Sequence, residues 1–253
     1  MKGHRLFIFI LAVGVFGILN TEMGVIGLLP YVSAYFSVSI SEAGALVSLF
    51  ALIVAVSGPV MPLLMSRFER KKAMLFVLAV FIAGNVISAV TDSFAILLAA
   101  RVIPAFFHPV YCALAFSAAA EAVPQEYAPD AVGKVMVGVA AGMVLGVPVS
   151  NFLADAVSLQ AAFAFFTAVT AAAFAATLFC IPSMPAGPKR TYGEQIGILR
   201  RPAVWMSIFA IVFMNGALFG VFTYLAEYLG VVTALSGGAV SLFLFVYGLS
   251  NSA

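Results

Sequence analysis

The stretch "LFIFILAVGVFGILNTEMGVIGLLP", residues Leu6–Pro30, is almost continuously apolar and contains one carboxylate, Glu22. A helix that crosses a bilayer needs about 20 apolar residues, and this run supplies about 24. The apolar region of a secretory signal peptide is only about 7–15 residues long and is followed by a small-residue cleavage site, which this run lacks. We therefore predict that the stretch is a retained transmembrane helix.

The composition of the whole chain also indicates a membrane protein. Of the 253 residues, 64% are hydrophobic and 9% are charged, whereas soluble domains have about 25% charged residues. The net charge of +2 is too small to indicate a nucleic-acid partner. Cys112 and Cys180 lie far apart in apolar segments, which predicts neither a disulfide framework nor a metal site. The lipid bilayer is thus the expected surroundings of the chain.

Eight apolar segments follow one another along the chain, at residues 6–29, 43–65, 73–91, 93–118, 132–153, 160–181, 203–226 and 238–251. "SISE", Ser39–Glu42, has the pattern of a capping box that opens the second segment. The eighth segment has about 14 residues, fewer than the roughly 17–25 needed to cross. We expect an all-α polytopic bundle with six helices in 1–182, a basic linker in 183–202, and about one and a half helices of a second bundle in 203–253, as in a piece of a longer protein.

The basic residues other than Arg101 predict the orientation. If the helices alternate, all of them lie on one side of the membrane: Lys2, Arg5, Arg67, Arg70, Lys71, Lys72, Lys134, Lys189, Arg190, Arg200 and Arg201. Loops rich in Lys and Arg stay in the cytoplasm. We therefore expect a multi-pass membrane protein with a cytoplasmic N-terminus.

Two charges fall inside apolar segments, Glu22 in the first and Arg101 in the fourth. Charges at this depth are costly and usually face a partner or a cavity. Counted from the expected outer ends of their segments, both lie roughly 11–12 Å deep, so we predict an ion pair between them. Two roles stay open for this pair: a purely structural contact, or a carboxylate that takes up a proton when its partner moves away.

Further polar and aromatic residues near these charges are candidates for the site. His108 follows Arg101 by two helical turns on the same face, and it is either a packing residue or a proton relay. Asn20 and Thr21 are either polar contacts between helices or cavity contacts. The predicted lining of a substrate cavity consists of Asn20, Phe106, Phe107, Tyr111 and Asn215.

A glycine stripe marks the fifth segment, where Gly138, Gly142 and Gly146 recur every four residues and Pro148 follows. Small residues at this spacing let two helix backbones approach closely, and a proline favours a bend. The stripe indicates either ordinary close packing or a seam on which two halves of a transporter rock. The basic turn between the second and third segments contains Arg67, Arg70, Lys71 and Lys72, and it is either purely topogenic or part of a cytoplasmic gate.

The chain resembles the major facilitator superfamily, and within it the drug:proton antiporter branch that includes the bacterial arabinose efflux permeases. The resemblance rests on the order of several motifs over nearly the whole chain: "TEMGVIGLLPYVSAYF", "LLAARVIPAFFHPVYCALA", "GMVLGVPVSNFLAD", "ILRRPAVW" and "FTYLAEYL". It implies a bacterial inner-membrane location. The loop between the second and third helices departs from the family pattern, since Pro62, Ser66 and Glu69 replace a Gly, an Asp and a second Gly. Glu69 or a helix end is then expected to substitute for the missing acid.

The resemblance implies a secondary transporter that exports a small organic molecule (a sugar, nucleoside or drug) in exchange for protons, with no cofactor beyond the proton gradient. Glu22 would carry the proton, Arg101 would be its charge partner and His108 a relay or substrate contact. The alternative is a fragment that does not transport, because alternating access needs two bundles around a midplane site. An enzyme is not expected, since the sequence has no HExxH, no G-x-S-x-G and no phosphate-binding loop.

Overall fold

The computed structural model describes residues 2–185, 197, 201–210, 212–214 and 217. The chain divides into two compact units, Met1–Gly187 and Pro188–Ala253. In the second unit, a short apolar helix spans Pro202–Met214, and the rings of Trp205, Phe209 and Phe213 follow one another along it. The predicted helix at 238–251 lies outside the described residues.

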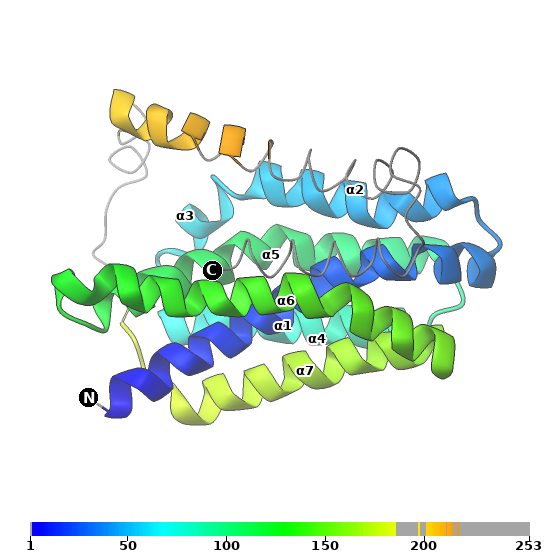
Figure 1. Cartoon of the computed structure of the whole chain (residues 1–253), viewed down its shortest axis with the longest axis horizontal. Coiled ribbons are helices and arrows are strands. Elements are labelled where there is room, and N and C mark those ends of the chain that lie inside the picture. The colour runs from blue at the N-terminus through cyan, green and yellow to red at the C-terminus, as the bar shows by residue number, and fades with distance from the viewer. Residues whose placement is uncertain (1, 186–196, 198–200, 211, 215–216, 218–253) are drawn as a thin grey trace, which may run out of the picture. The chain divides into compact units, whose positions relative to one another are not determined.

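The first unit is a bundle of helices (Figure 1). Its elements are α1 Lys2–Phe36, α2 Ile40–Ser57, α3 Met61–Met65, α4 Arg70–Val90, α5 Phe94–Glu121, the 3₁₀ helix η1 Gln125–Tyr127, α6 Ala128–Ala156 and α7 Leu159–Cys180. Six helices among the described residues, namely α1, α2 and α4–α7, are long and apolar enough to cross a membrane. The predicted all-α, polytopic bundle is confirmed.

Local sequence signals set several helix ends. Ser39 and Glu42 form the predicted capping box at the start of α2, where Ser39 Oγ accepts from the Glu42 backbone and the Glu42 carboxylate accepts from the Ser39 backbone. Ser158 caps α7 in a similar way by accepting from the Ala161 backbone. These side chains satisfy backbone N–H groups that have no partner within the helix.

Two predicted helix boundaries were wrong, both around proline. The first helix does not end at residue 29 but continues through Pro30 to Phe36, where Ser37 adopts a left-handed conformation with φ 54°. A proline inside a helix removes one backbone hydrogen bond, and the apolar residues beyond it continue the helix. The second helix ends at Ser57 instead of residue 65, and Gly58, Pro59 and Val60 separate it from the short helix α3.

α1 is the central helix of the unit. It contacts α2, α4, α5, α6 and α7, and in Figure 1 it runs through the bundle behind α6. Its residues Leu11, Val15, Ile18, Val25 and Leu28 are fully buried. Polar side chains on α1 are therefore held inside the bundle, where each needs a partner from another helix.

Candidate functional site

Three consecutive polar residues, Asn20, Thr21 and Glu22, occupy the middle of α1. Asn20 and Thr21 are fully buried, and the Glu22 side chain is 18% exposed. Because successive residues of a helix point about 100° apart, the three side chains meet different neighbours. Each is considered in turn.

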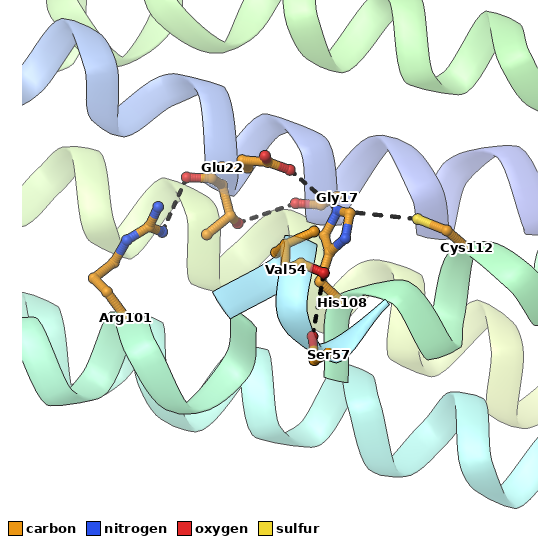
Figure 2. A network of polar contacts seen from close by, with 8 residues as sticks. Gly17, Glu22, Val54, Ser57, Arg101, His108 and Cys112 are labelled. Carbon is orange, nitrogen blue, oxygen red and sulfur yellow. Dashed lines mark hydrogen bonds and ion pairs between the residues drawn. The ribbon is translucent and has the colours of Figure 1, made fainter. Parts of the chain in front are cut away.

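Glu22 forms an ion pair with His108 of α5 (Figure 2). Glu22 Oε2 lies 3.1 Å from His108 Nε2. The orientation of the two groups is not that of an aligned hydrogen bond. Cys112, one turn further along α5, places its sulfur 4.0 Å from the same imidazole nitrogen. Phe50 and Phe81 pack their rings near the imidazole. The site thus joins a carboxylate and an imidazole in mostly apolar surroundings.

The predicted ion pair between Glu22 and Arg101 was wrong, and the length of α1 explains why. Because α1 extends to Phe36, Glu22 lies about four turns from the end of its helix. His108 lies about four turns after Phe94, where α5 begins, whereas Arg101 lies only about two turns after it. The Glu22 carboxylate therefore pairs with His108, and it acts on the positive charge of Arg101 only at longer range.

Arg101 instead binds the backbone of α1. Its Nη1 donates to the Thr21 carbonyl oxygen at 3.1 Å, as Figure 2 shows. The guanidinium carbon lies 4.8 Å from the centre of the Phe50 ring, an arrangement that stabilises a cation over an aromatic face. With only 3% of its surface exposed, Arg101 links α1, α2 and α5 beside the Glu22–His108 pair.

A fourth helix reaches this region through Asn85 of α4, which the sequence analysis did not single out. Asn85 Nδ2 donates to Thr21 Oγ1 at 3.2 Å, and Thr21 Oγ1 donates to the Gly17 carbonyl oxygen at 3.0 Å. A single amide within the apolar run "FVLAVFIAGNVISAV" was the available signal, because isolated polar residues in membrane helices usually bind across helices. Phe50, whose ring lies beneath the Arg101 guanidinium, has no comparable feature in the sequence around it.

Asn20 faces another part of the bundle. It shares a helical face with Gly17 and Gly24, which contact α7 and α6. Its two side-chain amide atoms are buried without a hydrogen-bond partner among the described residues, as are Arg101 Nε and His108 Nδ1. Buried polar atoms of this kind usually have a bound water or ligand as their partner. That Asn20 contacts a substrate cavity stays a prediction.

The aromatic candidates occupy different environments. Tyr111 is fully buried, and its ring occupies the space beside Gly14. Phe107 packs edge-on against Phe76, and Phe106 is 38% exposed. Asn215 lies outside the described residues. That these four residues line a substrate cavity stays a prediction.

The glycine stripe of α6 packs directly on α1. A Cβ at Gly138 would overlap the backbone of Ala12, one at Gly142 would lie 2.7 Å from Leu19 Cβ, and one at Gly146 would lie 3.1 Å from the Gly24 nitrogen. Pro148 lies inside α6, two residues after Gly146. The predicted close approach of two backbones is confirmed within the first unit, and the rocking of two halves stays a prediction.

The basic turn before α4 is tied to two neighbours. Arg70 forms an ion pair with Glu121, the last residue of α5, through both guanidinium nitrogens. Glu69 accepts from Ser183 Oγ at 2.7 Å and pairs with Lys72 at 2.9 Å. The Arg70 backbone N–H donates to the Met184 carbonyl oxygen at 3.1 Å. We call the contacts of Glu69 and Arg70 with Ser183 and Met184 the linker clamp.

Glu121 and Glu69 hold two of the basic residues near this turn, Arg70 and Lys72. That Glu69 or a helix end substitutes for the missing acid of the motif stays a prediction. Arg67 and Lys72 are largely exposed, and Lys71 is partly exposed. The sequence analysis did not single out Glu121. Its position at the end of α5, on the side of the basic turn, was the available signal.

Comparison with known proteins identifies the family. Residues 11–253 match the family model of the Major Facilitator Superfamily. The chain belongs to the major facilitator superfamily. Among this superfamily's curated members, it is 34% identical over 241 residues to the uncharacterized MFS-type transporter YtbD of Bacillus subtilis, with 95% of the chain and 61% of the relative covered.

Other superfamily members show similar coverage. The chain is 30% identical over 242 residues to the inner membrane transport protein YdhP of Escherichia coli, covering 96% of the chain and 62% of the relative. It is 24% identical over 249 residues to a "Probable sugar efflux transporter" of Helicobacter pylori, covering 98% of the chain and 63% of the relative. The chain therefore spans less than two thirds of the length of these relatives. It is a multi-pass membrane protein of the superfamily, and the buried Glu22–His108 pair lies on two of its membrane-crossing helices.

Proposed function

We propose that the protein exports a small organic molecule in exchange for protons, by alternating access. The observation that carries the proposal is the Glu22–His108 ion pair, buried within the membrane-crossing part of a superfamily member. Ionisable residues inside membrane helices are costly and generally belong to ion or substrate pathways. The names of the relatives YdhP and the sugar efflux transporter support transport of a small molecule.

The proposed coupling step starts from a proton reaching Glu22. Protonation removes the carboxylate charge and with it the ion pair to His108, so α1 and α5 lose one electrostatic contact. Arg101 keeps its bond to the Thr21 carbonyl oxygen, because a backbone acceptor does not titrate. The proton thereby biases the equilibrium between two arrangements of the helices. Loss of the proton to the other side of the membrane restores the pair.

The substrate is proposed only as a class. The candidates are sugars, nucleosides and hydrophobic drugs, which similar folds handle with different side chains. Alternating access requires two helical bundles around a midplane site, and the first unit provides one of them. The export activity therefore depends on a second bundle being present in the working protein.

Efflux from cells tests the proposal. Cells that express the chain and cells with an empty vector are loaded with labelled sugars, nucleosides and cationic dyes, and retention is followed with and without a protonophore. Lower retention of at least one compound, abolished by the protonophore, is the expected result. Equal retention of every compound would support the alternative, a membrane protein that does not transport by itself.

A further inference from the structure

An apolar furrow runs between α1 and α6 near the beginning of both helices. It has a volume of about 630 Å³ and is lined by Arg5, Ile8, Phe9, Ala12, Val13, Phe16, Lys134, Val137, Gly138 and Ala141. Eight of these ten residues are uncharged and apolar or small. Arg5 and Lys134 are the two charged residues of the lining, and both are cationic.

The furrow follows from the packing of the two helices. Ala12 contacts Gly138, Leu19 contacts Gly142 and Gly24 contacts Gly146, so α1 and α6 run in the same direction, as in Figure 1. Gly138 forms the floor, because it has no side chain to fill the space above the contact. The larger side chains of Phe9 and Val137, which are 63% and 64% exposed, form the walls.

Both cations lie at the same end of the furrow. Arg5 is in the first turn of α1 and Lys134 is in the second turn of α6, and parallel helices bring these ends to one side of the membrane. This is also the side that the basic loops predict to be cytoplasmic, where the leaflet is rich in anionic lipids.

The charge of the two cations is available to a ligand. Arg5 has no ion-pair partner among the described residues. Lys134 pairs with Asp130 one turn earlier on α6, and both side chains are more than half exposed. Exposed i,i+4 pairs of this kind contribute little to stability. A phosphate between Arg5 and Lys134 would compete with Asp130 for the same ammonium group.

We propose that the furrow binds one anionic phospholipid, with its phosphate between Arg5 and Lys134 and an acyl chain along Phe9, Val13 and Val137. In a bilayer, an apolar furrow of this kind fills with an acyl chain in any case, so the specific content of the proposal is the headgroup. Basic pockets between membrane helices on the cytoplasmic side are typical sites for anionic headgroups. Arg and Lys bind phosphate through charge-assisted hydrogen bonds.

The test measures lipid binding by the purified full chain in detergent. Native mass spectrometry with phosphatidylglycerol and, separately, phosphatidylcholine gives the two affinities. We expect phosphatidylglycerol to bind at least about tenfold more tightly, and Arg5→Gln or Lys134→Gln each to lower its affinity about fivefold. Lys72→Gln, which removes a cation that is 80% exposed at the start of α4, should leave the affinity unchanged.

Two further variants separate the headgroup from the furrow. Asp130→Asn keeps both cations and removes the competing carboxylate, so phosphatidylglycerol should bind more tightly. Ala141→Phe keeps all charges but fills the furrow, so both lipids should bind more weakly. Far-UV circular dichroism verifies that each variant is folded, and Asp130→Asn remains informative if a cation variant does not fold.

Several outcomes would overturn the proposal. Equal affinity for the two lipids would remove the headgroup selectivity. Cation variants that bind like Lys72→Gln would move the site elsewhere, and an unchanged affinity in Asp130→Asn would remove Lys134 from it. Efficient cross-linking of Val137→Cys to residues beyond 203, in preference to lipid, would show that protein covers the furrow.

Discussion

Glu22 of α1 and His108 of α5 lie 3.1 Å apart at matching depths in their helices, and together they form a buried ion pair. His108 packs against Phe50 and Phe81, so the pair is held by apolar neighbours. An imidazole is the side chain that most readily takes up and releases a proton near neutral pH, and here its partner is the Glu22 carboxylate. The pair is therefore the part of the bundle to which the proposed proton coupling is assigned.

Removing either partner of this pair should destabilise the bundle more than removing both. Glu22→Gln and His108→Gln each leave a buried polar group unpaired, whereas the double variant leaves two neutral amides that can bind each other. We expect a coupling energy of about 0.5–3 kcal/mol between the two sites. Reversible unfolding of the four proteins in mixed micelles measures it. Strictly additive effects would mean that the contact contributes nothing to stability.

The close contact between α6 and α1 predicts a sharp difference between two glycines of the same helix. Gly138→Ala would place a methyl group against the backbone of Ala12, whereas nothing lies within 4 Å of a Cβ at Gly133. Overpacking should cost Gly138→Ala about 1–3 kcal/mol. Gly133→Ala should be neutral or slightly stabilising, because alanine favours the helix. Thermal unfolding of the two variants measures this difference in stability, and equal melting temperatures would refute the packing argument.

Arg101 and Phe50 should be energetically coupled. Phe50→Leu keeps an apolar side chain of similar size but removes the aromatic face below the guanidinium, so we expect a loss of about 0.5–2 kcal/mol. Phe152→Leu is the matched control, since Phe152 on α6 is 69% exposed. In an Arg101→Met background the effect of Phe50→Leu should shrink. An undiminished effect there would mean that Phe50 acts through packing alone.

The Glu22–Arg101 prediction failed for a reason of local geometry. Composition and apolar length were sufficient to predict the six helices, because both follow directly from the thickness of a bilayer. The ends of the helices were harder to predict from the sequence. Pro30 is typical of a helix end, but α1 continues through it to Phe36. An extension of about two turns in α1 was enough to exchange Arg101 for His108 as the partner of Glu22.

Other features could be predicted because they are short-range. The capping box at Ser39 depends on residues three apart, and the glycine stripe depends on a four-residue spacing. Asn85, Phe50 and Glu121 could not be placed in the same way, because their roles depend on which helices are neighbours. That information lies in the packing of the bundle and not in the sequence around each residue.

The linker clamp should depend on pH through Glu69. Hydrogen bonds from Ser183 and Lys72 lower the pKa of the Glu69 carboxyl below its ordinary value of 4.5. A lowered pKa in the folded protein means that the clamp is stabilised above pH 4.5 and that this stabilisation is lost as the pH falls through the folded-state pKa.

Hydrogen exchange at the Arg70 backbone amide, which donates to the Met184 carbonyl oxygen, measures the opening of the clamp once it is corrected for its intrinsic pH dependence. Protection should be high at pH 6 and should decrease at acid pH. In Glu69→Gln, protection at pH 6 should be as low as it is at acid pH in the unmodified protein. Glu126 is an exposed acid on η1, and Glu126→Gln should behave like the unmodified protein. Full protection in Glu69→Gln at pH 6 would mean that the backbone bond from Arg70 to Met184 holds the linker alone.

The dependence of efflux on a proton gradient in Glu22→Gln tests the central claim most directly. Efflux of an exported compound is measured in membrane vesicles with and without an imposed proton gradient, with Glu126→Gln as the control. We predict that the gradient accelerates efflux by the unmodified protein and by Glu126→Gln but not by Glu22→Gln, whose side chain carries no titratable proton. Undiminished acceleration in Glu22→Gln would contradict the assignment of proton coupling to the Glu22–His108 pair.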